Sequence, residues 1–283
     1  MDRLNALLAR FSVQAHMFHS GALCGSHDFA EHSGVGQLHL IQRGAVEAYH
    51  GGARPQQIVE PSVVLYPRPL AHRFITDPER GADMACANLR FSADSINPLA
   101  QALPAVVVLP LAQLTGAQPL LDLLFSEAFT PRCGGRQVVD RLFEVTLILI
   151  VRALLDRGEV EVGLLAGLSD PRLSKALVAI HESPAHGWNL RRLAAAAGMS
   201  RSHFAASFHE TVGQTPGDYL ARYRICVAQD LLRLGKSLQQ AADAVGYGSA
   251  SALSRAFTRY CGHSPREWRA AGLRLAIGPD RNH

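Results

Sequence analysis

The chain has 283 residues, of which 48% are hydrophobic and 18% are charged. This length suggests two domains, and this composition excludes a wholly disordered protein. The longest apolar run, residues 145–151, is far shorter than the roughly 20 residues that cross a bilayer. The N-terminus resembles no secretory signal, and five scattered cysteines fit a reducing compartment better than a disulfide scaffold. We therefore expect a cytoplasmic protein that makes no membrane contact.

Charge divides the chain unevenly. Residues 1–169 hold 13 basic and 16 acidic side chains, whereas residues 170–283 hold 15 basic and 8 acidic ones. The net charge is therefore −3 in the front part and +7 in the back part. A basic half beside an acidic one indicates either a polyanionic partner or a solvated basic surface, and charge alone does not decide between them.

Residues 1–97 are predicted to form a short helix followed by a β-rich domain. Apolar and alternating runs indicate strands at residues 38–41, 46–49, 63–66 and 86–91. A His-Gly-Gly sequence after the second run is a hairpin signal. Short strands at this spacing predict a small barrel or sandwich.

Residues 98–168 change to helical patterns and form a predicted linker. Helices are expected at 119–129 and 136–157, followed by a connecting segment at 158–167. The run 145–151 is apolar on every side of its helix, which must therefore be buried. Either the protomer's own core or a second copy could cover it, and we expect a dimerisation region here.

Residues 170–272 contain an internal repeat. Leu190 and Gly198 recur 48 positions later as Leu and Gly, and Phe208 and Pro216 recur 49 positions later as Phe and Pro. In each copy a short helix ends at a glycine, a tight turn follows, and a second helix carries the phenylalanine. This pattern predicts two helix-turn-helix units.

Two such units in tandem favour DNA as the polyanion. The second helix of each unit can enter the major groove. The helix expected between them, residues 215–234, would span about 30 Å, and major grooves on one face of DNA recur about every 34 Å. The alternative is a helical bundle with a duplicated hairpin and no nucleic acid, which the basic charge and the tandem spacing disfavour.

The C-terminal motif resembles a known family. Gly-Tyr-Gly-Ser at 246–249, followed by Phe257, Gly262 and Ser-Pro at 264–265, is similar to the signature of the AraC/XylS bacterial transcription regulators. The resemblance covers about 170–271. In the front half, residues 36–44, 63–72 and 86–91 resemble, in order along the chain, the cupin-like sensor of a branch that includes a reactive-chlorine-responsive activator.

The resemblance implies an α+β protein with two domains. A small cupin-like β-barrel (1–97) with a helical linker and dimerisation region (98–168) would precede an all-α tandem helix-turn-helix domain (170–272). It also implies a transcription regulator, an activator rather than an enzyme, which needs no cofactor. Its expected partners are promoter DNA, a second copy in a homodimer, RNA polymerase, and a small-molecule or oxidant effector.

By the same analogy, six residues are candidates for DNA contact, three at the N-terminal end of the first reading helix and three that face the groove from the second. They are Arg201, Ser202, His203, Ser249, Ser251 and Arg255. Arg255 is the best single candidate for reading a base, because arginine can contact guanine with two hydrogen bonds. Ala205 and Ala206 stand where relatives carry long polar side chains, so the first helix is expected to act more through phosphates and DNA shape. Three other basic residues could contact DNA phosphates or could simply be solvated surface charges, and we favour the second interpretation for each. They are Arg222, Arg224 and Arg259.

Two histidines are candidates for an effector or metal site in the front half. His39 and His72 fit inward-facing strand positions, but the chain lacks the compact His-x-His and Glu pattern of metal-binding cupins. A metal-dependent cupin enzyme with a DNA-binding appendage is therefore the disfavoured alternative. The two histidines could bind a small ligand or a soft metal, or could be hydrogen-bonded barrel residues, and the metal is left unknown.

Cys24 and Cys86 correspond, by the resemblance, to the cysteine pair of the reactive-chlorine sensor. A sensor thiol needs thiolate character, access and a resolving partner. The resemblance therefore implies redox sensing by these two residues. The alternative is a pair of structural thiols, because free cysteine is often a core residue.

Overall fold

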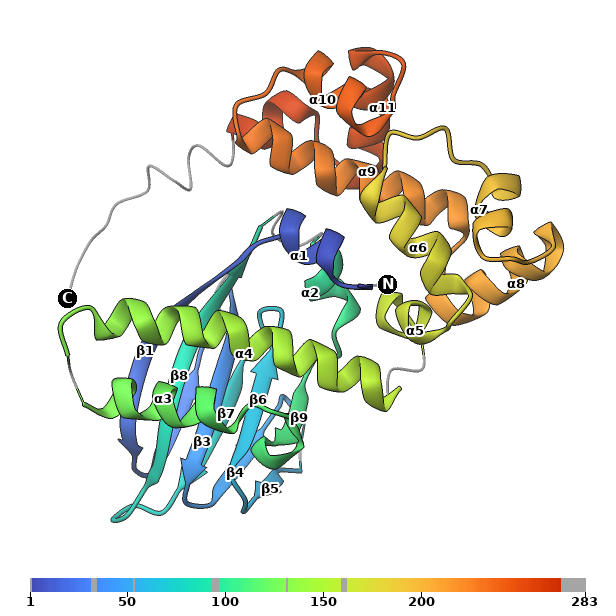
Figure 1. Ribbon diagram of the computed structural model, residues 1–283. Coiled ribbons are helices and arrows are strands. Elements are labelled where there is room, and N and C mark those ends of the chain that lie inside the picture. The colour runs from blue at the N-terminus through green and yellow to red at the C-terminus, as the bar shows by residue number, and fades with distance from the viewer. Residues whose placement is uncertain are drawn as a thin grey trace. The chain divides into compact units, whose positions relative to one another are not determined.

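The computed structural model describes residues 2–31, 35–52, 54–92, 97–130, 132–158 and 162–270. The chain divides into two compact units (Figure 1). The β unit is Phe11–Ser169, and the helical unit combines Met1–Arg10 with Asp170–His283. This division differs from the expected three parts, because residues 98–169 belong to the same unit as the strands and the first ten residues belong with the C-terminal helices.

The β unit is a sandwich of two antiparallel sheets. The first sheet contains β1 (Val13–Leu23), β3 (Gly36–Arg43), β6 (Ser62–Tyr66), β8 (Ala82–Phe91) and β9 (Val107–Pro110). The second contains β2 (Ser26–Phe29), β4 (Val46–Tyr49), β5 (Gln56–Ile58) and β7 (His72–Thr76). Their strand orders are β1-β8-β3-β6-β9 and β2-β7-β4-β5, so in the described part of the chain two sheets take the place of the expected closed barrel.

The central strands of the first sheet are buried on both faces. Every residue of β6 is buried, as are residues 36–41 of β3. One face of this sheet packs against the second sheet, and α3 (Gln118–Phe129) and α4 (Gly135–Arg157) pack on its other side (Figure 1). Burial on two faces explains why β6 carries the continuous apolar run 63–66 instead of a strict alternation.

The helix α4 is only partly buried. It begins one residue before its predicted start, and Phe143, Leu147 and Ile150 lie in the core. Val138 and Val145, in contrast, are 40% and 42% exposed. The prediction that this helix is buried on every side is therefore wrong for the protomer, which leaves these two valines exposed on its outer side.

Three short helices complete the β unit. These are α2 (Pro98–Ala102), a 3₁₀ turn η2 (Leu111–Gln113) and α5 (Leu164–Ser169). The segment expected to be a connection at 158–167 is partly helical, because α5 buries Leu164, Leu165 and Leu168. Residues 159–161 lie outside the described residues. The sheet also extends into the region expected to be helical, since β9 pairs with β6.

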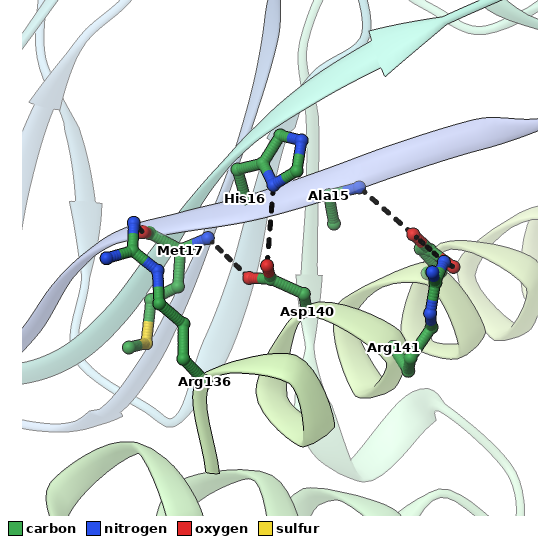
Figure 2. Close-up of polar contacts among 7 residues, drawn as sticks. Ala15, His16, Met17, Arg136, Asp140 and Arg141 are labelled. Atoms are coloured by element: carbon green, nitrogen blue, oxygen red, sulfur yellow. Dashed lines mark hydrogen bonds and ion pairs between the residues drawn. The ribbon is translucent and has the colours of Figure 1, made fainter. Parts of the chain in front are cut away.

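Helix α4 supplies hydrogen-bond partners to the edge strand β1 (Figure 2). The backbone N–H of Met17 donates to Asp140 Oδ1 at 2.8 Å, and that of Ala15 donates to Glu144 Oε1 at 3.3 Å. The Arg136 guanidinium donates to the Met17 carbonyl oxygen at 3.2 Å. These side chains satisfy backbone groups that an uncovered edge strand would leave open to another chain.

The helical unit has seven labelled helices and a further helical segment at residues 265–270. The labelled helices are α1 (Asn5–Arg10), α6 (Leu173–Glu182), α7 (Leu190–Ala196), α8 (Arg201–Val212), α9 (Pro216–Arg233), α10 (Leu238–Val245) and α11 (Ala250–Cys261). Helix α1 packs against α6 and buries Leu7 completely. The Asp170 carboxylate accepts from the backbone of Arg172 and Leu173 just before the start of α6. Among the described residues, none of the helices has both the length and the apolar character needed to cross a membrane.

Candidate nucleic-acid interface

Helices α7 and α8 form one helix-turn-helix unit, and α10 and α11 form the second. Each first helix ends at a glycine in the left-handed region, Gly198 at φ +65° and Gly246 at φ +78°. Only glycine adopts this conformation without strain, which explains why both copies of the repeat carry it. Phe208 and Phe257 are fully buried, so the repeated phenylalanines anchor the second helix of each unit.

The start of α8 presents polar side chains to solvent. Ser200 caps the helix by accepting a hydrogen bond from the backbone of His203 at 3.4 Å. Arg201, Ser202 and His203 are all exposed. Ala206, four residues after Ser202, is also exposed but has no polar group. Contacts from this helix to DNA are thus expected at its first turn, where the backbone N–H groups also favour phosphate.

The start of α11 has a different division of roles. The Ser249 hydroxyl accepts from the backbone of Ala252 at 3.1 Å, so this candidate contact residue holds the helix cap. Ser251 and Arg255 are exposed and lie four residues apart, which places them on one face of α11. No hydrogen bond or ion pair ties the Arg255 side chain to another of the described residues. Its guanidinium is therefore available to a ligand.

Helix α9 connects the two units. Its 18 residues span about 27 Å, close to the expected length. The Thr215 hydroxyl caps it by accepting from the backbone of Asp218 at 3.2 Å. The equivalent cap after the second unit is reciprocal, because Ser264 and Glu267 each bond to the other's backbone N–H, at 3.2 and 2.8 Å. The helix that follows each unit thus begins with the same kind of side-chain cap.

The structure brings His39 and His72 together inside the β unit. Their Nε2 atoms lie 3.0 Å apart, and both side chains are buried. His72 Nδ1 lies 2.8 Å from the Leu70 carbonyl oxygen and must donate to it, so His72 Nε2 accepts from His39 Nε2. This tautomer leaves His39 Nδ1 as an acceptor, and it has no hydrogen-bond partner. Burial lowers the pKa of both rings, that of His72 to about 4.

Cys24 and Cys86 are not brought together. Leu23 pairs with Ala82 across β1 and β8, so Cys24 lies level with residue 81 and five residues along the strand from Cys86. At about 3.3 Å per residue this offset is roughly 16 Å, whereas a disulfide needs Cα atoms about 4.4–6.8 Å apart. Cys24 is exposed, but Cys86 is fully buried, and burial raises the pKa of its thiol. A bond between them would require the strands to separate.

The surroundings of Cys86 include a histidine that the sequence patterns did not single out. Cys86 pairs with His19 on β1 and with His39 on β3, so the three side chains lie in a row on one sheet face. His19 Nε2 is buried without a hydrogen-bond partner. The residue was missed because strand β1 was not predicted. Within the described ranges, no group of three or more His, Cys, Asp or Glu side chains is arranged to hold a metal ion.

Comparison with known proteins identifies the family. A cupin family model matches residues 2–156, more than half of the chain, and a helix-turn-helix domain model matches residues 193–271. An AraC-like transcription regulator of Streptomyces antibioticus is 42% identical over 59% of this chain. The chain belongs to the AraC family, in its cupin-containing form. The match to the cupin model agrees with the sheet-rich β unit, and the second match agrees with the tandem helical repeat.

Two further relatives of this AraC-family chain bear on its function. A helix-turn-helix transcriptional regulator of Haemophilus influenzae is 34% identical over 66% of the chain. The activator RclR of Escherichia coli, named as specific for RCS, is 26% identical over 98% of the chain and 100% of its own length. The matches span 56% and 62% of the Streptomyces and Haemophilus relatives, less than two thirds of either. All three are named as transcription regulators, which indicates a regulator and not the cupin enzyme considered above.

Proposed function

We propose that this AraC-family chain is a cytoplasmic transcription activator that binds promoter DNA through both helix-turn-helix units. The observation that carries the proposal is the pair of capped reading helices, α8 and α11, whose N-terminal halves expose arginine and other polar side chains. The unit that holds them includes most of the basic part of the chain. The name of the RclR relative supports activation in preference to repression.

The two reading helices divide the work of recognition. Arg201, Ser202 and His203 would contact phosphates or base edges at one groove, and Ser251 and Arg255 would do so at the next. The Ser249 hydroxyl already accepts a hydrogen bond in the helix cap. Ser249 therefore contributes to DNA binding only if its hydroxyl or its backbone also forms a hydrogen bond to DNA. Arg255 is the base reader in this scheme, because its side chain is exposed and not engaged elsewhere.

The proposed active form is a homodimer. Leu123 of α3 and Val138 and Val145 of α4 are 46%, 40% and 42% exposed, and a second copy would cover these apolar side chains. Dimer formation would place four reading helices on one promoter. Activation would then follow from contact with RNA polymerase, which is the partner expected of a promoter-bound activator.

The proposed signal is an oxidant that acts on Cys24 and Cys86. Cys24 is exposed and can react first, and the buried Cys86 would resolve the oxidised sulfur once β1 and β8 separate. With hypochlorous acid, two thiols give one disulfide, and the oxidant is reduced to chloride and water with release of one proton. The alternative effector is a small ligand or soft metal at His39 and His72, which the unpartnered Nδ1 of His39 favours.

Selection of bound sequences from a random DNA duplex library tests the DNA proposal. The full-length protein should enrich two half-sites, and its affinity should fall steeply with salt. In Arg255→Ala, discrimination should relax at one or two base pairs, by about 1–3 kcal/mol. Arg259→Ala, four residues closer to the C-terminal end of the same helix, is the control and should leave base preference unchanged. Equal loss of affinity on all sequences in Arg255→Ala would refute base reading, and no enrichment by the wild type would refute DNA binding.

A free-thiol count before and after stoichiometric hypochlorous acid tests the signal. Loss of two thiols, mapped to Cys24 and Cys86 and reversed by a reductant, is the expected result. Scattered or unchanged thiols would contradict oxidant sensing and would move the search to His39 and His72. This outcome would leave the DNA-binding proposal standing.

A further inference from the structure

The loop between α6 and α7 is tied firmly to the first helix-turn-helix unit. The Trp188 indole N–H donates to the Ser183 carbonyl oxygen at 2.9 Å, and Arg192 on α7 donates to the Gly187 carbonyl oxygen at 2.6 Å. Asn189 then caps α7 by accepting from the backbone of Arg192 at 3.0 Å. The loop therefore moves with α7, and α7 packs against the reading helix α8.

Arg224 on α9 is fixed to this loop and is not the solvated charge that the sequence favoured. Its Nε atom donates to the Pro184 carbonyl oxygen at 2.8 Å, and its Nη2 atom donates to the His186 carbonyl oxygen at 2.9 Å. The same guanidinium lies over the ring of Tyr247, 5.9 Å from the ring centre. Tyr247 belongs to the turn between α10 and α11. One side chain thus contacts both helix-turn-helix units.

The turn of the second unit also touches the loop directly. A Cβ atom built on Gly246 would lie 2.5 Å from the Ala185 carbonyl oxygen and 2.8 Å from its Cα atom. Gly246 is therefore needed here for a close approach as well as for its left-handed conformation. The two helix-turn-helix units are thus in contact at this point, in addition to being connected through α9.

We propose that Arg224 is a positioning residue that sets the separation and rotation of α8 relative to α11, and so determines which half-site spacing the protein accepts. The inference rests on the proposed DNA binding. One added base pair moves the second half-site by about 3.4 Å and rotates it by about 34°, since B-DNA has about 10–10.5 base pairs per turn. Because Arg224 fixes one helix-turn-helix unit to the other, the two reading helices cannot move apart or rotate to match the displaced half-site. Arginine suits the role because its planar fork donates to two carbonyl oxygens while one face stacks on an aromatic ring.

Binding to duplexes of different spacing tests the inference. The best duplex selected by the wild-type protein is compared with versions that carry one inserted or one deleted base pair between the half-sites. For Arg224→Ala we expect the penalty for these changes, as a ratio of dissociation constants, to fall about tenfold, the order expected for lost hydrogen bonds to a charged group. Arg224→Lys keeps the charge but not the fork and should give an intermediate loss. Arg222→Ala, on the same helix with its guanidinium over Tyr260 and not on the loop, should leave spacing discrimination unchanged.

Spacing discrimination separates positioning from mere support of the fold. The inference is overturned if the ratios of dissociation constants between duplexes of different spacing are the same in Arg224→Ala as in the wild type. This includes the case in which the variant binds all duplexes more weakly by one common factor. Should that variant not fold, as judged by circular dichroism, Tyr247→Leu and Arg224→Lys carry the same test. A wild-type protein that enriches no half-sites at all would refute the proposed function first, and the inference with it.

Discussion

The two units of the molecule hold their candidate functional residues in opposite ways. The helical unit exposes them on short, repeated segments, as with Arg201 in the first turn of α8 and Arg255 in the second turn of α11. The β unit encloses them between strands distant in sequence: His39 and His72 are 33 residues apart and share a buried hydrogen bond. A surface that reads an external polymer must be accessible, whereas a signal received inside a packed sandwich must act by changing the packing.

This difference decides how each region can be tested. In the helical unit, removal of an exposed side chain should change binding and leave stability intact. In the β unit, almost any change at the candidate site should alter stability as well. Both tryptophans, Trp188 and Trp268, lie in the helical unit, so tryptophan fluorescence reports its unfolding, and the labelling rate of the buried Cys86 reports opening of the β unit.

The largest expected effect is the loss of a repeated core phenylalanine. Phe257→Ala should destabilise the helical unit by about 3–5 kcal/mol, because the fully buried ring leaves a cavity. Phe208→Ala is the matched variant in the first repeat and should cost a similar amount. Denaturant unfolding followed by tryptophan fluorescence measures the change. Unequal losses of stability in the two variants would show that the two repeats are not equivalent. A simultaneous rise in the labelling rate of Cys86 would show that the β unit does not unfold independently of the helical unit.

Acidification should destabilise both units through their buried histidines. Burial lowers the pKa of His181 in the helical unit to about 3 and that of His72 in the β unit to about 4. The unfolded rings bind protons below about pH 6.5, whereas the folded rings do not. Stability is therefore complete above pH 6.5 and should fall on acidification, by about 2 kcal/mol for His181 between pH 6.5 and 4.5.

His181→Phe separates the two contributions. This variant should flatten the pH dependence measured by tryptophan fluorescence, although it also removes the hydrogen bond to the Tyr219 hydroxyl. The pH dependence of Cys86 labelling should persist, since it arises from His39 and His72. A helical unit that remains acid-sensitive in His181→Phe would contradict the assignment.

The helical unit could be predicted from the sequence because its signals are local. Capping serines, turn glycines and a core phenylalanine lie within one or two helices of each other, and these signals occur in both copies of the repeat. The role of Arg224 could not be predicted, because its partners Pro184, His186 and Tyr247 lie 23–40 residues away and two of them offer only backbone oxygens. A basic residue on an amphipathic helix gives no sign of such partners.

The β unit was predictable as a class of fold but not in its pairing. Strands rich in apolar residues, such as Ser62–Tyr66, stand out, whereas β1 mixes histidines and small residues and was missed. Without β1, the sequence could not place His19 beside Cys86 or show that Cys24 lies at the far end of the same strand pair. Register between strands decides these distances, and register is set by long-range packing.

A smaller effect is expected where α4 covers the edge of the sheet. Asp140→Ala should destabilise the β unit by about 1–3 kcal/mol, because the backbone N–H of Met17 would lose its acceptor. Asp140 also lies 3.4 Å from His16, which adds an ion pair when that ring is protonated. The control is Arg141→Ala next to it, which removes only an exposed pair with Glu144 and should cost less than about 1 kcal/mol. Cys86 labelling measures both, and equal effects would mean that α4 does not hold the strand.

The smallest expected effect concerns the cap of α10, where the two repeats differ. Ser237 accepts from the backbone of Gln240 at 3.1 Å, and Gln240 accepts from the backbone of Ser237 at 2.9 Å. Its counterpart Asn189 caps α7 with its side chain alone. Ser237→Ala should cost about 1 kcal/mol, and Asn189→Ala should cost more than this, because Asn189 also anchors the loop held by Arg224. Fluorescence-detected unfolding compares the two variants. A larger loss in Ser237→Ala would mean that the reciprocal cap outweighs the loop, and that the second repeat depends on its caps more than the first.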